Sequence, residues 1–208
     1  MKAPKPKNEV QRIKILWQYD VLDTMPEQVF DDFTNLAALI CDAPISLISL
    51  VDEDRQWFKS KLGVSVSETS RDISMCAHAI LQGDLFIVPD ATKDRRFKDN
   101  PLVVSEPKIR FYAGAPLVSP EGLALGTLCV IDQVPRQLTA TQQQALRVLA
   151  RIVMTQLNFR RQSQIAGTSH AGHGKTKTDS APAPVKILRL PRSQKSSSAR
   201  SSAQRPQR

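Results

Sequence analysis

The sequence has few of the residues on which several common protein classes depend. Only three of its 208 residues are cysteines (Cys41, Cys76 and Cys129), and they lie far apart with no Cys-x-x-Cys spacing. A disulfide framework or a zinc ribbon needs more regularly spaced cysteines, so we expect three reduced, buried thiols. His78 is the one histidine before residue 162, which excludes a metal site built on two histidines in that part of the chain.

Long apolar runs are also missing. No stretch approaches the ~18–20 apolar residues that a membrane-spanning helix needs. Residues 1–7 are basic and rich in proline, and no apolar run of the kind found in a signal peptide follows them. These two absences predict a cytoplasmic protein. The hydrophobic fraction of 41% is nevertheless large enough for a real core.

The positive charge belongs to the two ends of the chain. The net charge is +9, of which residues 162–208 carry +8 and residues 1–14 carry +4, whereas residues 15–161 carry −3. A dedicated nucleic-acid-binding domain carries its positive charge on the fold, so this distribution argues against one. Residues 162–208 also lack aromatic residues and are rich in Ser, Pro and Gln. We therefore predict a disordered N-terminus (1–8), one folded domain (9–161) and a disordered basic tail (162–208).

Two apolar runs predict a β-hairpin at the centre of the domain. Residues 111–118 and 123–131 are separated by Ser-Pro-Glu-Gly at 119–122, which is a turn signal. Alternation in the second run divides its side chains into two largely apolar sets, so we predict a central strand that is covered on both faces. One set is Leu125, Thr127, Cys129 and Ile131, and the other is Gly126, Leu128 and Val130. Gly126 suggests a place where something packs close to the backbone of this strand.

The remaining segments predict helices and strands around this hairpin. Residues 8–20 form a helical pattern with Val10, Ile13, Leu16 and Trp17 on one face, and a capping box at 24–27 opens a helix to about Cys41. Strands are predicted at 45–51, 55–62 and 85–88. A short helix over 75–82 has Ser74 as its N-cap, and a second capping box at 139–142 opens a helix to about Arg161.

This order of elements predicts an α+β fold. The antiparallel central sheet has the N- and C-terminal helices on one face and the short helices and loops of residues 64–108 over the other. A sheet covered by loops and short helices is a natural place for a small-molecule pocket.

Several segments together resemble the GAF domains found in bacterial sensor kinases and related signalling proteins. The resemblance covers about residues 10–161 and rests on YDVLDTMPEQVFDDFTNLAALI, ISLISLVDEDRQWFKSKLGV, ETSRDISMCAHAI, VPDATKDRRFKDNPLV, IRFYAGAPL and LALGTLCVIDQVPRQLTATQQQALRVLA. It implies a GAF/PAS-like sheet between helices. It also implies a sensory or regulatory role in which a small molecule or a signalling protein biases the terminal helices, without catalysis. No cofactor follows from it, because such domains serve many ligands.

The sequence departs from the family pattern at three points. After Arg161 we find no kinase, cyclase or phosphodiesterase module, so the domain is expected to stand nearly alone. The Asn-Lys-Phe-Asp-Glu pattern of cyclic-nucleotide-binding relatives is replaced by the different sequence of residues 94–99. The Cys-His dipeptide of bilin-binding relatives is interrupted, since Ala77 separates Cys76 from His78. These departures argue against a cyclic-nucleotide ligand and against a covalent chromophore.

Seven residues are candidates for ligand binding, each with a structural alternative. Cys76 lies at the start of the predicted short helix, where thiol pKa values fall, or is simply a small buried side chain. His78 is a ligand or a hydrogen-bonded structural histidine. Arg71 and Arg110 meet an anion, with Tyr112 beside Arg110, or join the loop to the sheet by ion pairs. Asp90 and Arg96 line the pocket rim together with Asp94 and Asp99, or form local caps and salt bridges.

Two other function classes remain open. A thiol enzyme that reduces methionine sulfoxide is one, because Cys76 lies near a cysteine of such stand-alone GAF enzymes, but no cysteine lies between Gly83 and Leu128. The other is a scaffold whose basic tail docks on nucleic acid or an anionic membrane. A homodimer through the terminal helices is a further hypothesis.

Overall fold

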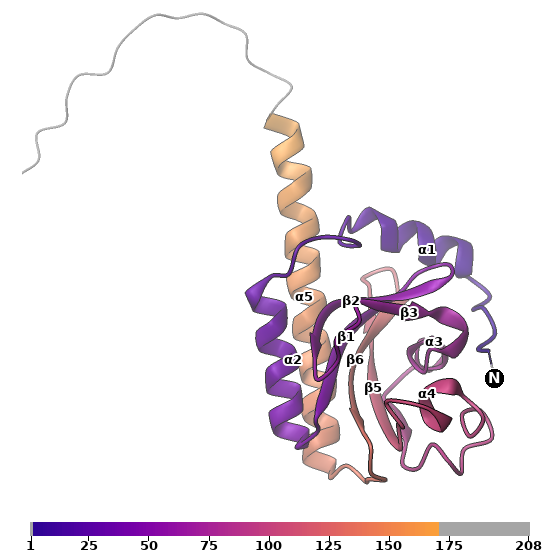
Figure 1. The fold of residues 1–208 in the computed structure, drawn as a ribbon. Helices are drawn as coiled ribbons and strands as arrows, with labels where there is room; N and C mark the ends of the chain where they lie inside the picture. Colours follow the sequence, from indigo (N-terminus) through magenta and orange to yellow (C-terminus); the bar gives the residue numbers. More distant parts are fainter. Residues whose placement is uncertain (1, 171–208) are drawn as a thin grey trace, which may run out of the picture. The chain divides into compact units, whose positions relative to one another are not determined.

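A six-stranded antiparallel sheet organises residues 2–170, the part of the chain that this computed structural model describes (Figure 1). The strand order is β3 (Glu68–Ser70), β2 (Arg55–Leu62), β1 (Ile45–Val51), β6 (Ala124–Asp132), β5 (Phe111–Val118) and β4 (Phe86–Val88). β6 lies between β1 and β5, and Ile48 of β1 is opposite Leu128 of β6. The predicted hairpin and the central position of its second strand are confirmed.

A bulge near the start of β6 changes one part of the predicted alternation. Leu117 pairs with Gly126 and Val118 pairs with Ala124, so Leu125 is the extra residue between them. A bulge reverses the direction of the side chains on one side of it, and Leu125 accordingly packs in the core on the opposite face from Thr127 and Cys129. The assignment of Leu125 was therefore wrong, whereas the assignments of residues 127–131 were correct.

Gly126 has the role that its place in the strand suggested. A Cβ atom at this position would lie 1.9 Å from the backbone oxygen of Ser49 in β1. The backbone of β1 cannot move away without breaking the ladder, so only glycine fits here.

Two long helices cover one face of the sheet. α2 (Gln28–Cys41) and α5 (Ala140–His170) lie against it side by side in Figure 1. Their apolar faces bury an apolar core that includes Phe30, Ile48, Phe111, Leu128, Leu146 and Val153. We call this side the helix face.

Short elements cover the opposite side, which we call the cover face. They are the 3-10 turn η1 (Arg71–Ile73), α3 (Cys76–Ala79) and α4 (Pro101–Val104), with the loops that join them (Figure 1). A second core lies beneath them and includes Leu47, Phe58, Cys76, Phe97, Tyr112 and Cys129. The predicted cover by the 64–108 segment and the α+β fold are confirmed.

The first helix does not lie beside α2 and α5. α1 (Glu9–Gln18) crosses the end of the sheet near the β1–β2 turn (Figure 1). Ile13 and Leu16 are buried as predicted, but Val10 and Trp17 are exposed. The buried side of α1 is set by Arg12, whose guanidinium donates to the Val51 carbonyl at 2.6 Å and to Glu9 at 2.8 Å. The spacing of apolar residues could not predict this buried arginine contact.

The two predicted capping boxes have different outcomes. At 139–142 the Gln142 N–H donates to Thr139 Oγ1 at 3.2 Å and the Thr139 N–H donates to Gln142 Oε1 at 3.0 Å, which confirms the box. At 24–27 the prediction was wrong. α2 begins at Gln28, and the Thr24 hydroxyl instead donates to the Val21 carbonyl and accepts from Lys59.

The domain boundaries also differ at both ends. Residues 2–8 were predicted to be disordered, but Ala3 is buried in the second core and Lys2 pairs with Asp72 at 2.8 Å. Packing against the cover face supplies the order that composition alone did not indicate. α5 continues past Arg161 to His170. The rest of the predicted tail, 171–208, lies outside the described residues. Within the described part we find no helix with the length and apolar character of a bilayer-spanning segment.

Candidate functional site

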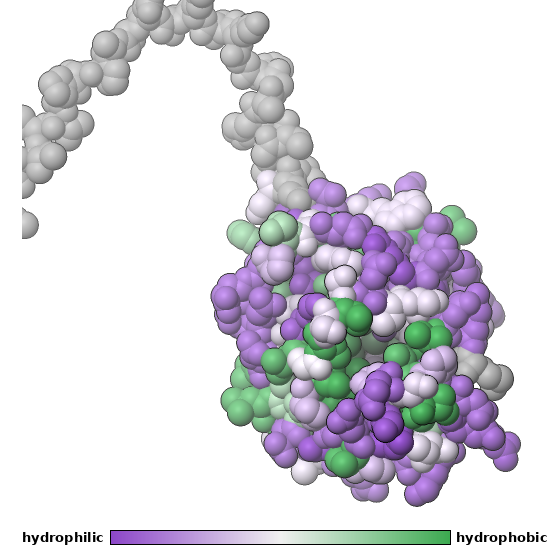
Figure 2. Space-filling model, in the orientation of Figure 1, coloured by the Kyte–Doolittle hydropathy of each residue, from purple (hydrophilic) through white to green (hydrophobic). Residues whose placement is uncertain are grey.

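A cavity of about 430 Å³ opens on the cover face between the β1–β2 hairpin and residues 102–109. Figure 2 shows hydrophobic residues gathered around a hollow in this region of the surface. The cavity walls are mostly apolar, and Gln56, Thr69 and Glu106 are among its polar groups. The main apolar lining residues are Leu47, Phe58, Val64, Leu102, Ile109 and Ile131. Its size and mixed lining are typical of a small-molecule site.

Gln56 connects this cavity to a polar cluster deeper in the cover face. Its side-chain oxygen accepts hydrogen bonds from the hydroxyl groups of Ser74 and Ser49, the latter at 3.4 Å, and its amide donates to Thr69 Oγ1 at 2.8 Å. The Ser74 hydroxyl also accepts from the Ala77 N–H at 3.0 Å, as expected for an N-cap of α3. The cavity wall and the start of α3 therefore share one hydrogen-bond network.

Two thiols lie at the inner end of this network. Cys76 of α3 and Cys129 of β6 have their sulfur atoms 3.9 Å apart. The Tyr112 hydroxyl of β5 donates to Cys76 Sγ at 3.3 Å and lies 3.4 Å from Thr127 Oγ1. All four side chains are buried. The alternation of β6 directs Thr127 and Cys129 toward the same side, and α3 brings Cys76 down onto them.

These contacts shift the pKa values of the two thiols in opposite directions. The Cys129 thiol donates to Cys76 and lowers the pKa of Cys76, burial opposes this change, and hydroxyl donors including Thr127 and Tyr112 reinforce it. The same interaction, together with burial, raises the pKa of Cys129. Burial and then the negative charge on Cys76 raise the pKa of Tyr112. Cys76 is therefore the thiol that ionises first.

Arg71 joins α1 to the cover instead of facing the cavity. Its guanidinium donates to the Glu9 carboxylate and to the Asp52 carbonyl, the latter at 2.8 Å. Burial tends to raise the pKa of Glu9, but the hydrogen bonds and charges of Arg12 and Arg71 outweigh it and lower the pKa to about 2. Arg71 therefore forms an internal ion pair, as in the structural alternative, but its partner lies on α1 instead of on the sheet.

The other charged candidates also make local contacts. Arg110 donates to the carbonyl groups of Val103 at 2.8 Å and Ile109 at 3.1 Å, which holds the segment after α4. Asp90 accepts from the N–H and the hydroxyl group of Thr92, and Arg96 donates to Asp94 at 2.9 Å. These are the local caps and salt bridges of the structural alternative.

None of the seven candidate residues lines the cavity, and four of them lie in two pairs away from it. Cys76 and Tyr112 meet in the thiol cluster. His78 lies edge-on to the Phe97 ring with 4.8 Å between centroids, and the Arg96 guanidinium lies 5.3 Å from the same ring. In the described residues no group of three or more His, Cys, Asp or Glu side chains is placed to hold a metal ion.

Sequence reasoning missed Cys129, Thr127 and Ser49 as neighbours of Cys76, and it missed Gln56 as the link between this cluster and the cavity. Alternation in β6 placed Thr127 and Cys129 on one face, and the same rule applied to β1 and β2 would have directed Ser49 and Gln56 to that face. No sequence signal indicated that α3 brings Cys76 next to Cys129.

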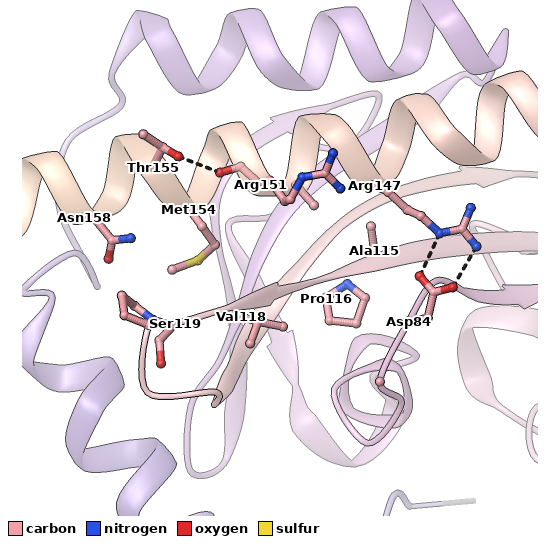
Figure 3. A pocket seen from close by; sticks show the side chains of 13 residues that line it. Asp84, Ala115, Pro116, Val118, Ser119, Arg147, Arg151, Met154, Thr155 and Asn158 are labelled. Carbon is pink, nitrogen blue, oxygen red and sulfur yellow. Dashed lines mark hydrogen bonds and ion pairs between the residues drawn. The ribbon is translucent and has the colours of Figure 1, made fainter.

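A second hollow, of about 480 Å³, lies between β5 and α5 (Figure 3). β4 pairs with β5 only at residues 112–114, so in the described structure no strand covers the outer edge of residues 115–118. The Arg147–Asp84 ion pair, with 2.7 Å between Nε and Oδ1, closes one end of this groove. Polar and charged side chains of α5 line much of it, which makes it less suited to a buried small molecule than the cavity on the cover face.

Comparisons with known proteins agree on one family. A family model described as the GAF domain matches residues 25–157. A cyclic di-GMP phosphodiesterase of Pseudomonas aeruginosa is 45% identical over 156 residues, which make up 74% of this chain and 27% of that protein. The chain thus matches about a quarter of the length of this curated relative.

Solved structures show the same fold at low sequence identity. The GAF domain of Thermosynechococcus elongatus PixJ, in its blue-light-absorbing form, is 15% identical with a TM-score of 0.54, covering 81% of this chain and 99% of that one. Free methionine-R-sulfoxide reductase of Neisseria meningitidis is 17% identical with a TM-score of 0.54, covering 78% and 98%.

Proposed function

This chain belongs to the GAF domain family, and from that premise we propose that it is a sensory module that binds a small molecule in the cover-face cavity and has no catalytic activity of its own. The cavity itself carries the proposal. It has the volume of a ligand site, its walls are apolar, and Gln56 and Thr69 offer hydrogen bonds at its inner side.

A signalling role agrees with the comparisons. The curated relative of Pseudomonas aeruginosa is a phosphodiesterase for cyclic di-GMP, and only part of its length corresponds to this chain. We infer that the present domain regulates an output in signalling, with turnover of that dinucleotide as the first output to examine.

The cavity has a physical connection to the N-terminal helix. Arg71 begins η1 on the cover side and bonds the Glu9 carboxylate of α1. A ligand that moves the cover changes the geometry of this ion pair, and α1 moves with it. By this route binding would bias a terminal helix.

Protein partners are the second part of the proposal. Leu36 and Leu39 of α2 and Ile152 and Phe159 of α5 are exposed apolar side chains on the helices of the helix face. We propose that they contribute to a homodimer or to contact with a signalling protein. The predicted contact of the basic tail with anionic surfaces concerns mainly residues 171–208, which lie outside the described part of the chain.

A neutral apolar fluorophore, N-phenyl-1-naphthylamine, tests the cavity directly. We expect saturable binding to the full chain. Leu102→Trp fills the cavity and should abolish binding, whereas Leu39→Trp, on exposed α2, should leave it unchanged. Displacement of the probe by members of a metabolite library would then identify ligand classes.

Two kinds of result would contradict the proposal, one for the ligand site and one for the absence of catalysis. If the probe binds both tryptophan variants equally well, or if no library compound displaces it or raises the melting temperature, the cavity is not a ligand site. Turnover of methionine sulfoxide with a thiol reductant, or hydrolysis of cyclic di-GMP by the purified chain, would contradict the absence of catalysis.

A further inference from the structure

We propose that Cys76 and Cys129 form a redox-active site that small hydroperoxides oxidise to an intramolecular disulfide. The two sulfur atoms are 3.9 Å apart in the centre of the cover face. A disulfide needs about 2.05 Å, so the sulfur atoms must move closer. Cys76 lies on the four-residue helix α3, and its sulfur contacts the Tyr112 and Cys129 side chains of the sheet. A small shift of this helix supplies the movement.

The surroundings of Cys76 suit a nucleophilic thiolate. The Tyr112 hydroxyl donates to its sulfur at 3.3 Å, and Cys129 and Thr127 lie beside it. These donors stabilise negative charge on sulfur, and the thiolate is the form that attacks peroxide. A structural thiol in an ordinary core has no such set of donors.

Cys41 provides the contrast within the same chain. It is buried in the helix-face core, where burial raises its pKa to about 11. In the described structure its sulfur makes no hydrogen bond to a second thiol or to a tyrosine hydroxyl, in contrast to that of Cys76. Cys41 should therefore stay reduced under conditions that oxidise the pair.

The chemistry balances with a hydroperoxide as the only co-reactant. The Cys76 thiolate attacks the terminal peroxide oxygen, so that an S–O bond forms and the O–O bond breaks. Hydroxide leaves and takes up a proton as water when the oxidant is hydrogen peroxide, and an alkoxide leaves and becomes the alcohol when it is an organic hydroperoxide. The Cys129 sulfur then attacks the sulfenic sulfur, so that the S–S bond forms, the S–O bond breaks, and water leaves with the thiol proton. Two thiols lose two electrons in total, and the peroxide gains them.

The position of the pair gives oxidation a structural effect. α3 belongs to the cover, and β6 is the central strand of the sheet. The disulfide would tie the cover to the sheet beside the network that reaches Gln56 in the cavity wall. The oxidation itself requires no ligand in the cavity, so its failure is distinguishable from failure of the proposed ligand site.

Mass spectrometry of the full chain after treatment with hydrogen peroxide tests the proposal. We expect the intact mass to fall by two hydrogen atoms and dithiothreitol to reverse the change. Digestion without reductant should yield a peptide that joins Cys76 to Cys129, with Cys41 reduced. Cys41→Ser should still form this bond. Cys129→Ala should stop at a sulfenic acid on Cys76, which dimedone traps.

The tyrosine hydroxyl allows a rate test that a merely buried pair would fail. Tyr112→Phe keeps the ring and removes the donor. At pH 5, below the pKa of Cys76 of about 6, a one-unit rise in that pKa lowers the thiolate population about tenfold. The greater nucleophilicity of the more basic thiolate offsets part of this loss, so we expect oxidation at pH 5 to be about threefold slower. Tyr19→Phe is the matched control, since the Tyr19 hydroxyl donates to Asn158 on the other side of the molecule.

The proposal is overturned if all three thiols stay reduced, if Cys41 is oxidised as fast as Cys76, or if the products are only intermolecular disulfides. It is also overturned if Tyr112→Phe and Tyr19→Phe react at the wild-type rate while circular dichroism shows that both variants are folded.

Discussion

The two faces of the sheet are built from different materials. The helix face packs large aliphatic and aromatic side chains beneath α2 and α5, two long helices with continuous apolar stripes. The cover face combines apolar residues with thiols, hydroxyl groups and a glutamine, beneath elements of three or four residues. The strand β6 contributes side chains to both cores, with Leu128 on the helix face and Cys129 on the cover face.

This difference suggests a division of labour. Apolar burial on the helix face provides most of the stability, because burial of hydrocarbon is the dominant favourable contribution to folding. The cover face contains more polar groups that must be kept hydrogen-bonded, and short elements are easier to displace than long helices. The face with less apolar packing is the one with the cavity and the thiol pair.

Neighbouring residues of β6 give the largest expected contrast. Leu128→Ala should lower the free energy of unfolding by about 3 kcal/mol, because it leaves a cavity under two packed helices. Cys129→Ala removes only one sulfur atom and should lower it by about 1 kcal/mol. Urea unfolding of the reduced proteins measures both. Equal losses would show that the two faces contribute alike.

The ion network that joins α1 to the cover should show itself in the pH dependence. The pKa of Glu9 is about 2 in the folded protein and has its ordinary value of 4.5 in the unfolded chain. The ionised carboxylate therefore stabilises the fold fully above pH 4.5, and this contribution is lost as the pH falls through 2. The shift corresponds to about 3 kcal/mol. In urea unfolding between pH 7 and pH 2.5, Glu9→Gln should lack this part of the wild-type pH dependence.

Arg71→Met should lose part of the same pH dependence, because Arg71 supplies one of the two guanidinium groups that pair with Glu9. A Glu9→Gln variant with the same pH profile as the wild type would mean that the network contributes no stability between α1 and the cover.

Two serines of β1 give the smallest and most closely matched contrast. Ser46 lies on the helix-face side, where its buried hydroxyl has no hydrogen-bond partner in the described structure. Ser46→Ala should raise the free energy of unfolding by about 1 kcal/mol, since an unpaired buried hydroxyl is unfavourable. Ser49 faces the cover and bonds Gln56, so Ser49→Ala should lower it by about 1 kcal/mol. Thermal unfolding distinguishes the two signs, and the same sign for both would remove this distinction between the faces.

Much of the fold was predictable because its elements have strong local signals. β1, β2 and β5 lie at the predicted residues, and the box at Thr139 begins α5 as expected. The errors have local physical causes. The bulge at Leu125 reversed the direction of one side chain. The buried guanidinium of Arg12 fixed which side of α1 faces the core, and this side differs from the one that the apolar residues predicted.

The candidate site was much less predictable. Cys76 and Tyr112 lie in contact, but Arg71 and Arg110 are occupied by internal contacts. A sequence shows which residue types are present, whereas their use depends on partners that lie far away along the chain. Arg71 and Glu9 are separated by most of α1, by α2 and by the first three strands, and no short-range pattern joins them.

The amino-acid sequence by itself determined the antiparallel sheet, its central hairpin and the helices on either side, because hydrophobic periodicity and turn chemistry act over a few neighbouring residues. Only the tertiary structure decided that Cys76 lies beside Cys129, that Gln56 connects this pair to a cavity, and that Arg71 holds α1. Those arrangements depend on strand order and on how a short helix packs across the sheet, and both are fixed by contacts between distant segments.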